Sequence, residues 1–438
     1  MNKNYPRLLV ADKKGSVYDV PFLQGTGMKA CEYYSLYKEN LVKLHPDSEL
    51  FMLTDRHPIG FDPRKSRFVQ IEHNPLINRK EPCYAVAAFL PPGYTATYSS
   101  AYWENDKTSL LPLFSYAAVV FYKDAFYATG VRVDREKRQE LKGMNMEIVK
   151  GNVKIFRKMF PKNRLVEHIV SCALLYGCPA AKNFFLKRYE GPLPSSPTCN
   201  ARCLGCISYQ PGKGCSVTQP RIKFVPTPEE IAEVALFHIK NVKDAIVSFG
   251  QGCEGEPLMV SDVLEKAVCL IRKGTSKGLI NLNTNASKPE AIIRLFRAGL
   301  NSIRVSVNSF QKTYYERYYM PQGYSFREVV KSIGAAKRAG GFVSINYLTL
   351  PGFNDSEKEV FSLKKFLDKT NIDMIQWRNL NYDPMVYFEK LGIKPGKDRM
   401  IGIDVLIKKV KKEYPQLMHG YFNPSFKKIK RSKNNVLY

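Results

Sequence analysis

The chain has 438 residues, of which 44% are hydrophobic, so it is long enough for two domains with sizeable cores. An excess of 67 Lys and Arg over 40 Asp and Glu makes nucleic acid a candidate partner. The ten cysteines exclude a disulfide framework, because several, such as Cys83 and Cys269, stand alone in apolar sequence. Residues 110–122, the longest nearly apolar stretch, are fewer than the ~20 needed to span a bilayer. We expect a soluble, cytoplasmic protein.

The N-terminal part is predicted to be rich in strands and then helical. Residues 8–11, 50–53 and 68–71 have the composition of strands, and residues 117–122 and 125–133 form a predicted hairpin around Lys123 and Asp124. From residue 136 to residue 188 the apolar period lengthens to that of helices, with breaks near Pro161 and Pro179. A segment rich in Pro and Ser at residues 191–197 marks the predicted end of this domain.

Three cysteines lie directly after that segment, midway along the chain. Cys199, Cys203 and Cys206 follow a Cys-x3-Cys-x2-Cys spacing, which is one ligand short of a closed metal site. Iron–sulfur clusters are normally held by four thiolates, so a set of three leaves one iron free to bind another ligand. An open coordination position is typical of a catalytic metal centre, whereas structural sites are closed.

After the cysteines, short β-rich runs alternate with helical stretches. The predicted strands are residues 245–249, 279–282, 302–307, 342–350 and 374–377. The predicted helices are residues 228–241, 261–273, 288–298, 326–339 and 356–368. Repeated βα units imply a parallel sheet with right-handed crossovers. A strand leading into the cysteine loop brings the count to about six, so the fold class is α/β, with a partial (β/α)6 TIM-like barrel.

Polar loops follow these strands at the edge where α/β barrels hold their ligands. The Gly-rich run at residues 250–258 contains two carboxylates, Glu254 and Glu256, which can bind a cation or an ammonium group. Ser306 and Asn308 share one face of a strand and are suited to hydrogen-bonding a sugar. The other polar loops are residues 283–286 and 350–355.

The order of these features resembles that of the radical S-adenosylmethionine (SAM) enzymes. The resemblance covers about residues 195–385, and the cysteine spacing is its specific part. In that superfamily the three cysteines hold a 4Fe-4S cluster, and the methionine amino and carboxylate groups of SAM occupy the free iron. The resemblance therefore implies an enzyme that cleaves SAM reductively to a 5′-deoxyadenosyl radical, which abstracts hydrogen from a substrate.

The resemblance also implies particular site residues, although it identifies no catalytic residue. It makes Cys199, Cys203 and Cys206 the cluster ligands, and it makes Glu256 the acceptor of the SAM ammonium group. The other SAM-binding candidates are Gly255, Pro257, Asn285, Ser306, Asn308 and Gly352, of which Ser306 and Asn308 would contact ribose. The chain departs from the family pattern twice, with Gly205 where an aromatic residue commonly precedes the third cysteine, and with Glu254 in place of a glycine.

The remaining cysteines allow other interpretations. Cys215 lies nine residues after Cys206 and would complete a four-cysteine zinc site. Cys253 lies inside the predicted SAM loop and is either a structural thiol or a catalytic one. Cys172 and Cys178 lie in an apolar helical stretch and are predicted to belong to the core.

These observations predict three regions and one leading function. Residues 1–190 form an N-terminal α+β, strand-rich accessory domain, residues 191–385 form the radical SAM core, and residues 386–438 form a basic helical extension. The expected function is a radical SAM enzyme acting on RNA, a peptide or a metabolite, and the resemblance implies an electron donor such as flavodoxin or ferredoxin. The alternative is a non-enzymatic zinc or iron–sulfur module that binds nucleic acid.

Overall fold

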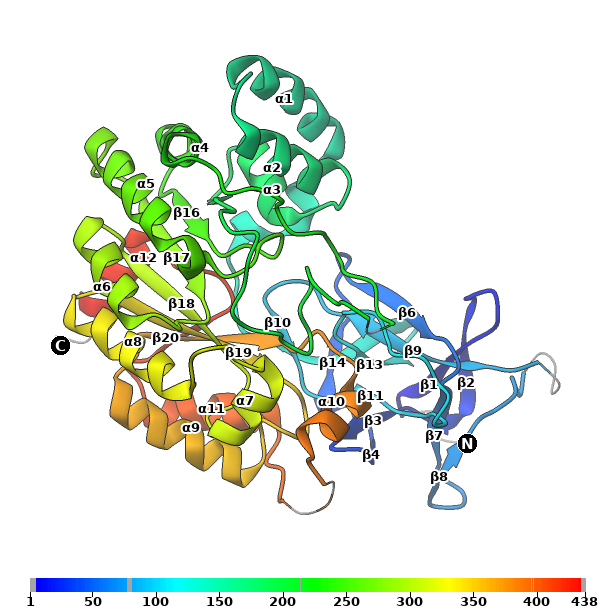
Figure 1. Cartoon of the computed structure of the whole chain (residues 1–438). Coiled ribbons are helices and arrows are strands. Elements are labelled where there is room, and N and C mark those ends of the chain that lie inside the picture. The colour runs from blue at the N-terminus through cyan, green and yellow to red at the C-terminus, as the bar shows by residue number, and fades with distance from the viewer. Residues whose placement is uncertain (1–4, 77–80, 213, 395, 397, 435–438) are drawn as a thin grey trace. The chain divides into compact units, whose positions relative to one another are not determined.

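The computed structural model describes residues 5–76, 81–212, 214–394, 396 and 398–434 (Figure 1). Residues of the chain group into two compact units, each assembled from separate segments. The first unit contains residues 1–134, 348–364 and 377–413, and the second contains residues 135–347, 365–376 and 414–438. The three domains expected at residues 1–190, 191–385 and 386–438 therefore stay a prediction.

The first unit is built on antiparallel strands. Their order in the sheet is β12-β7-β2-β1-β9-β13-β11-β3-β4, with β5, β6, β8, β10 and β14 paired at the side of this path. The strands are β1 (Arg7–Ala11), β2 (Val17–Gln24), β3 (Thr26–Lys29), β4 (Glu32–Ser35), β5 (Leu41–Lys43), β6 (Glu49–Leu53), β7 (His57–Asp62), β8 (Arg67–Gln70), β9 (Tyr84–Phe89), β10 (Tyr94–Ala96), β11 (Ser99–Ser100), β12 (Tyr102–Trp103), β13 (Ala117–Tyr122) and β14 (Ala125–Arg132). The strands predicted near residues 8, 50, 68, 117 and 125 are all present.

The predicted hairpin at β13 and β14 has the expected tight turn. Val119 pairs with Ala128 and Tyr122 pairs with Ala125, so only two residues connect the strands. Both of them, Lys123 and Asp124, have positive φ angles of 46° and 54°. Two such residues in succession are typical of the type I′ turn, whose twist matches that of the flanking strands.

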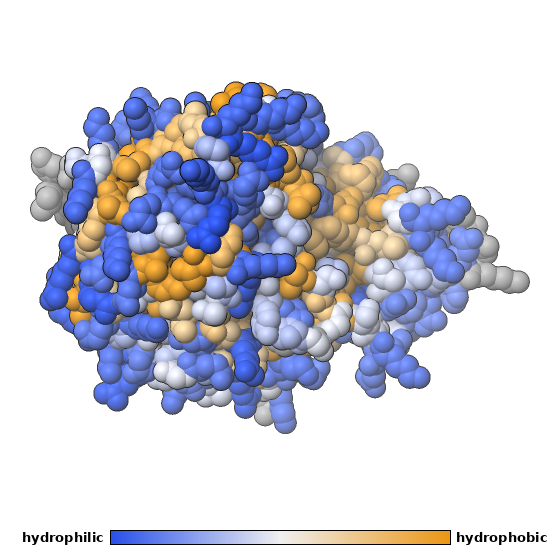
Figure 2. All heavy atoms as spheres, turned by 45° about the horizontal axis from the view of Figure 1, so that its top comes forward, coloured by the Kyte–Doolittle hydropathy of each residue, from blue (hydrophilic) through white to orange (hydrophobic). Residues whose placement is uncertain are grey.

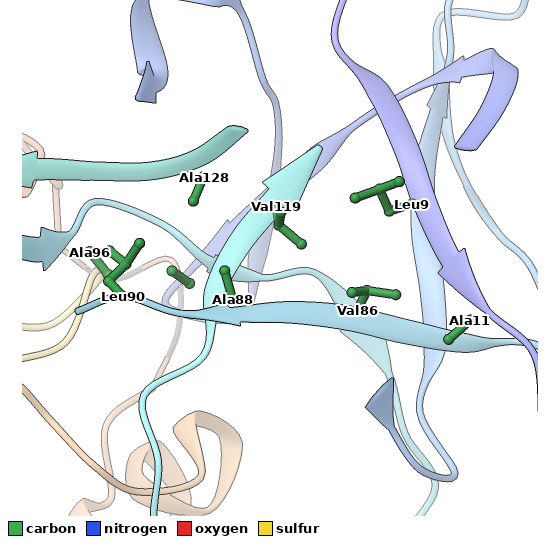
Figure 3. Close-up of a cluster of buried hydrophobic side chains, with 9 residues drawn as sticks. Leu9, Ala11, Val86, Ala88, Leu90, Ala96, Val119 and Ala128 are labelled. Atoms are coloured by element: carbon green, nitrogen blue, oxygen red, sulfur yellow. The ribbon is translucent and has the colours of Figure 1, made fainter. Parts of the chain in front are cut away.

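One hydrophobic core of this unit lies where alternate residues of neighbouring strands meet. Leu9 and Ala11 of β1 face Val86 and Ala88 of β9, and Val119 of β13 lies beside them (Figure 3). The residues are two apart on each strand because side chains alternate between the faces of a sheet. The many alanines bring the backbones close together, so a larger side chain here would overpack the core.

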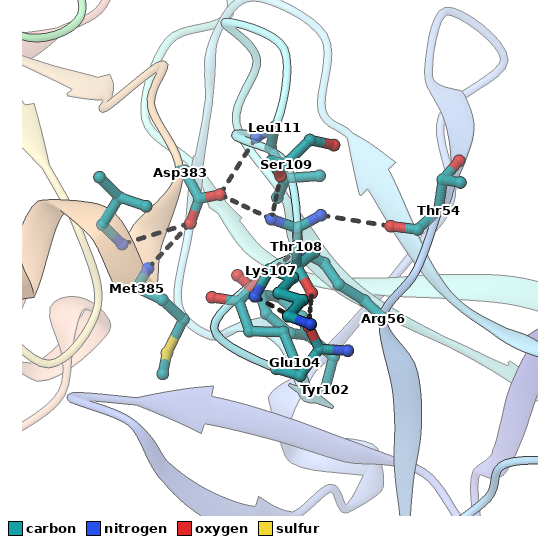
Figure 4. Close-up of polar contacts among 12 residues, drawn as sticks. Thr54, Arg56, Tyr102, Glu104, Lys107, Thr108, Ser109, Leu111, Asp383 and Met385 are labelled. Carbon is teal, nitrogen blue, oxygen red and sulfur yellow. Dashed lines mark hydrogen bonds and ion pairs between the residues drawn. The ribbon is translucent and has the colours of Figure 1, made fainter. Parts of the chain in front are cut away.

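A buried arginine connects segments of the first unit that are far apart in sequence (Figure 4). Arg56, only 2% exposed, donates from Nη2 to Asp383 Oδ2 over 2.9 Å, and its Nε lies 2.7 Å from Glu104 Oε2. It also donates to the carbonyl oxygens of Thr54 and Ser109. Burial and the nearby Asp383 raise the pKa of Glu104 to about 6, although Arg56 opposes this.

Replacement of this arginine should destabilise the protein strongly. Arg56→Ala leaves Asp383, which is fully buried, without a cation, and the loss of one partner of a buried ion pair costs about 3–5 kcal/mol. Arg64→Ala is the matched control, because that side chain is 62% exposed and its ion pair with Asp62 should contribute about 1 kcal/mol or less. Urea denaturation measures both variants, and equal midpoints for them would contradict the role of Arg56.

The second unit begins with helices, as expected for residues 136–188. Two short 3-10 turns, η2 (Lys137–Gln139) and η3 (Leu141–Gly143), precede α1 (Met146–Met159), α2 (Arg164–Leu174) and α3 (Pro179–Phe185). Asn145 and Asn163 cap α1 and α2 by accepting hydrogen bonds from backbone N–H groups of the first turn. Pro179 is the first residue of α3, where its missing N–H costs nothing.

A parallel sheet follows, in the order β15-β16-β17-β18-β19-β20-β21. Its strands are β15 (Glu190–Pro192), β16 (Ile246–Phe249), β17 (Leu279–Thr284), β18 (Ser302–Val307), β19 (Phe342–Thr349), β20 (Met374–Asn379) and β21 (Met418–Gly420). The helices are α4 (Pro228–Asn241), α5 (Ser261–Gly274), α6 (Pro289–Ala298), α7 (Lys312–Tyr319), α8 (Phe326–Arg338), α9 (Glu357–Thr370), α10 (Pro384–Leu391), α11 (Ile403–Glu413) and α12 (Phe426–Asn434). Figure 1 shows α4, α5, α6 and α8 along one side of the curled sheet, so the predicted partial barrel is confirmed.

Two elements of this unit were not expected from the sequence. Strand β21 lies within the predicted helical extension and pairs in parallel with β20, Met374 beside Met418. Helix α7 is rich in tyrosine, which favours strands, so no helix was predicted there.

Figure 2 shows a surface on which hydrophilic residues predominate and hydrophobic ones are interspersed. Within the described part of the chain, the helices are too short or too polar to cross a membrane.

Candidate functional site

The cysteine loop lies between β15 and α4 and is anchored through its backbone. Arg202 N–H donates to the carbonyl oxygen of Tyr319 over 2.9 Å, and Leu204 N–H donates to that of Tyr318 over 3.0 Å. These are the last two residues of α7, so the helix missed from the sequence holds the segment between the cysteines. The backbone of the loop is therefore anchored to the end of α7.

The surroundings of the three cysteines shift their pKa values in different directions. Burial raises the pKa of Cys199 to about 11 and that of Cys203 well above its usual value. Burial acts the same way on Cys206, yet its pKa is lowered overall by the backbone N–H of Ser208 and by Arg221. The guanidinium Nη2 of Arg221 donates to Cys206 Sγ over 3.4 Å. Arg221 is thus a site residue that the cysteine spacing did not identify.

Aromatic side chains surround Cys203. The buried tyrosines Tyr315, Tyr319 and Tyr324 have raised pKa values, chiefly because of burial, and Cys203 is a further cause in each case. The sequence lacks the aromatic residue expected at Gly205, whereas these tyrosines, from α7 and the segment after it, lie near enough to Cys203 to interact with it electrostatically.

Glu254 fixes the segment before the cysteines. Its Oε2 accepts hydrogen bonds from Ser195 N–H, Ser195 Oγ–H and Ser196 N–H at 2.8, 2.9 and 3.0 Å, and its Oε1 accepts from Gln251 N–H at 2.6 Å. Burial raises the pKa of Glu254 to about 7 in spite of these donors. The glutamate that departs from the family pattern therefore has a structural task, because it joins the Gly-rich loop to the chain entering the cysteine loop.

Glu256 connects the Gly-rich loop to the end of β17. Its carboxylate accepts hydrogen bonds from Thr284 Oγ1–H at 2.5 Å, Asn285 N–H at 2.7 Å and Leu258 N–H at 3.1 Å. The residue is 4% exposed, and burial raises its pKa to about 7. Among the described residues no Lys, Arg or His forms an ion pair with it. A buried carboxylate without a protein cation suits the ammonium group of a ligand.

Asn285 extends this connection to the cysteine loop. Its Nδ2 donates to Asn200 Oδ1 over 2.8 Å, and Asn200 Nδ2 donates to Ser287 Oγ over 3.0 Å. Pro257 begins the short 3-10 helix η4 (Pro257–Val260). The structure therefore brings Cys199, Glu256 and Asn285 into one neighbourhood, as the sequence predicted for a common site.

Ser306 and Asn308 follow the predicted alternation along β18. Ser306 is half-buried at the end of the strand, beside Asn346 of β19, and Asn308 is fully buried, with Nδ2 donating to the carbonyl oxygen of Tyr314. The predicted contact of these two side chains with ribose stays a prediction.

The same face of the sheet carries further polar side chains. Arg304 Nη1 donates to Gln376 Oε1 over 3.3 Å, Gln376 Nε2 donates to Asn423 Oδ1 over 2.9 Å, and Asn423 Nδ2 donates to Glu190 Oε1 over 2.8 Å. Beside this row of hydrogen bonds, Asn281 Nδ2 of β17 donates to Asn283 Oδ1. The interior of the partial barrel is therefore polar rather than filled with aliphatic residues.

Gly352 and Cys215 belong to other environments. Gly352 lies in the first unit with φ of 89°, and a Cβ there would meet the backbone nitrogen of Ala30 at 1.9 Å, which explains the glycine structurally. Its predicted contact with SAM stays untested. Cys215 is half-buried, and in the described part of the chain it belongs to no group of three closely spaced metal-binding side chains.

Gly255 should not tolerate a side chain. A Cβ at this position would lie 2.0 Å from the carbonyl oxygen of Thr198, the residue before Cys199. Gly255→Ala must therefore displace the cysteine loop, at a cost of about 1–3 kcal/mol, and it should lower the iron content of the reconstituted protein. Gly151→Ala on α1 is the control, because a Cβ there meets nothing within 4 Å and should be neutral or slightly stabilising. Iron held equally by both variants would refute this account.

The donor groups fit the cofactors that the resemblance implies. Three cysteines on one loop, one of them hydrogen-bonded to an arginine, provide thiolate ligands for an iron–sulfur cluster. The buried Glu256 carboxylate provides an anionic acceptor next to that loop.

Comparison with known proteins identifies the family. GTP 3′,8-cyclase of Aquifex aeolicus (strain VF5) is 31% identical to this chain over 177 residues, which is 40% of this chain and 52% of that protein. Molybdenum cofactor biosynthesis protein 1 of Mus musculus is 31% identical over 163 residues, which is 36% of this chain and 23% of that protein. The chain thus spans about half or less of these curated relatives. The solved structure of native anSMEcpe with bound AdoMet is 16% identical with a TM-score of 0.34, and it covers 44% of this chain and 51% of that chain.

A likeness at that TM-score carries no argument about function, whereas the family model does. Residues 193–363 match the model of the radical SAM superfamily. This match confirms the resemblance seen in the sequence, the 4Fe-4S cluster and SAM as the cofactors of the family, and the class of enzyme to which the domain belongs. Residues 193–363 of the chain therefore form a radical SAM domain.

Proposed function

We propose that the protein is a radical SAM enzyme that abstracts a hydrogen atom from a polar substrate held inside the partial barrel. The observation that carries the proposal is the joining of the three-cysteine loop to two buried carboxylates. Glu254 binds the backbone at Ser195 and Ser196, and Glu256 binds the end of β17. A purely structural metal knuckle does not require a buried carboxylate that lacks a cation.

In this proposal the cysteine loop holds the cluster and the Gly-rich loop holds SAM. Cys199, Cys203 and Cys206 hold the 4Fe-4S cluster, and Arg221 stabilises the Cys206 thiolate by hydrogen bonding. Glu256 accepts the ammonium group of SAM, with Gly255 and Pro257 shaping the loop. When bound, the cluster and SAM supply a 5′-deoxyadenosyl radical on reduction.

The remaining candidates orient SAM and exclude water. Asn285 holds the cysteine loop through Asn200. Ser306 and Asn308 are assigned to ribose. The tyrosines around Cys203 keep water from the site. Because the chain matches only part of each curated relative, their reactions are not transferred to it.

The polar interior of the barrel supports a small, polar substrate. Arg304, Gln376 and Asn423 form a hydrogen-bonded row, and Arg304 contributes a positive charge suited to an anionic group such as a phosphate or carboxylate. GTP is the first compound to test, because one relative is named as a GTP cyclase.

A lysine-rich groove supports nucleic acid as a partner, though not as the buried substrate. It has a volume of about 880 Å³ and is lined by Lys240, Lys243, Lys277, Lys427 and Lys430. Its lining residues 239–245 and 276–278 directly precede β16 and β17, whereas the cysteine and Gly-rich loops lie at the opposite ends of the strands. The groove is therefore at the wrong edge of the sheet to present a base to the cofactors.

Loss of one cluster ligand should abolish SAM cleavage. Cys206→Ala removes the thiolate that Arg221 contacts, and a two-cysteine loop cannot hold the cluster. The measurement is 5′-deoxyadenosine formed under a strong reductant after anaerobic reconstitution. Cys269→Ala, an exposed thiol on α5, is the control and should retain full cleavage.

The same experiment separates the enzyme from the non-enzymatic alternative. A brown wild-type protein with about four irons per chain that forms 5′-deoxyadenosine supports the enzyme. If the Cys206→Ala variant still cleaves SAM, Cys206 is not a ligand of the cluster. A wild-type protein that holds no iron and forms no 5′-deoxyadenosine favours the zinc module.

Arg304 provides a test of the substrate class. Arg304→Gln removes a charge-assisted hydrogen bond worth about 1.5–3 kcal/mol, so the apparent affinity for an anionic substrate should fall at least about tenfold. Stimulation of 5′-deoxyadenosine formation is titrated with GTP and with candidate phosphates and carboxylates. Arg338→Gln, an exposed side chain at the end of α8, should leave the titration unchanged. Equal affinities in the two variants would exclude Arg304 from substrate binding.

A further inference from the structure

A second group of metal-binding side chains lies apart from the cysteine loop. One ligand atom each from His168, Cys172 and Cys253 lies within 4.8 Å of the other two. In the described part of the chain this is the one group of three histidine, cysteine or acidic side chains with such close spacing. Cys172 and Cys253 are 3% and 4% exposed. The sequence predicted Cys172 for the core and left Cys253 as either a structural or a catalytic thiol.

The elements bring these residues together in a definite way. His168 and Cys172 are four residues apart on α2 and therefore share one face of the helix. Cys253 comes from the Gly-rich loop after β16, and its carbonyl oxygen accepts a hydrogen bond from Ile222 N–H over 2.8 Å. The group therefore spans α2 and the loop that carries Glu254 and Glu256.

A fourth cysteine lies beside the group. Cys178 caps the start of α3, and its N–H donates to the carbonyl oxygen of Cys172 over 3.0 Å. Its thiol is close enough to Cys172 and Cys253 to affect them electrostatically. Burial raises the pKa of Cys178, although the backbone N–H groups of Ala181 and Ala180 oppose this.

The spacing matches a single metal ion. Tetrahedral zinc with bonds of about 2.3 Å to sulfur and about 2.0–2.1 Å to nitrogen places a sulfur and a nitrogen ligand about 3.6 Å apart. The observed separation of Cys172 Sγ and His168 Nε2 is 3.6 Å. The thiolates of a four-iron cluster bind different irons and must lie farther apart, so the close spacing argues against a second cluster.

The hydrogen bonding within the group also resembles that of a metal site. Cys253 donates to Cys172, and this bond together with His168 lowers the pKa of Cys172 despite burial. The same bond, with burial, raises the pKa of Cys253. Two sulfurs and an imidazole nitrogen therefore share one buried position, where a bound cation would replace the thiol protons.

We propose that His168, Cys172 and Cys253 bind one zinc ion, or another thiolate-preferring divalent ion, through two thiolates and one imidazole. Cys178 lies beside this group but outside its close spacing, and it is the candidate for the fourth tetrahedral position. Binding would release the thiol protons to solvent and stabilise the folded chain. The ion would tie α2 to the Gly-rich loop and so hold Glu254 and Glu256 in place. The site does not depend on the proposed reaction.

Metal analysis of the full-length protein tests the proposal directly. Wild-type protein with its iron–sulfur cluster should contain about one zinc per chain in addition to iron. Cys172→Ser and Cys253→Ser should each lose the zinc, and Cys178→Ser should bind it at least about tenfold more weakly. Cys206→Ala should lose iron and keep zinc, and Cys269→Ser should keep both. These last two variants separate the proposed site from the cysteine loop.

A second measurement needs no substitution in the site. Wild-type protein prepared without zinc is titrated with Co²⁺, and the expected result is the visible spectrum of tetrahedral cobalt with thiolate charge-transfer bands, together with a higher unfolding temperature. Absence of zinc and of these bands in folded wild-type protein would overturn the proposal. So would zinc retained in both Cys172→Ser and Cys253→Ser, or a disulfide between Cys172 and Cys253 in the isolated protein.

Discussion

Two buried carboxylates hold the entry to the cysteine loop, the Gly-rich loop and the end of β17 together. Transfer of a carboxylate out of water is costly unless hydrogen bonds replace its hydration. Glu254 meets this requirement with donors from Ser195, Ser196 and Gln251, and Glu256 meets it with donors from Thr284, Asn285 and Leu258. Neither carboxylate can move without losing several bonds at once. The entry to the cysteine loop, the Gly-rich loop and the end of β17 are therefore fixed together.

This arrangement explains a departure from the family pattern. Glu254 stands where a glycine is expected, yet its side chain points back to the chain before the cysteines and leaves Glu256 at the end of β17. The backbone of the loop still approaches the cysteine loop closely, because Gly255 N–H donates to Ser196 and Glu256 N–H donates to Thr198. Where the family pattern has two glycines, this chain keeps the close approach of the two loops with Gly255 alone.

The sequence was most informative where local signals dominate. The alternation of strands and helices is such a local signal, and it was confirmed in position. Thr227 caps α4 with a hydrogen bond from Glu230 N–H, which is also a local interaction. Elements that depend on distant partners were not predictable. Strand β21 has three residues and exists because β20 pairs with it, and α7 forms although its tyrosines favour strands.

The site residues were also predictable only where the signal in the sequence is local. Cys199, Cys203 and Cys206 could be recognised from their spacing alone, but nothing near Arg221 in the sequence indicates that it contacts Cys206. His168 and Cys172 form a spacing common to many helices, and the significance of Cys253 appears only when the fold brings it to them. Contacts between residues 80 or more positions apart are set by packing, which a single sequence does not reveal.

The buried contact of Arg56 with Asp383 also constrains how the chain is made. The two residues are 327 positions apart. At a synthesis rate of roughly 5–20 residues per second, Arg56 leaves the ribosome roughly 16–65 s before its partner is made. Throughout that interval the β-rich first unit lacks its segments at residues 348–364 and 377–413. The strands of its sheet all lie within residues 7–132, so the sheet can pair during this interval while Arg56 still lacks the Asp383 carboxylate.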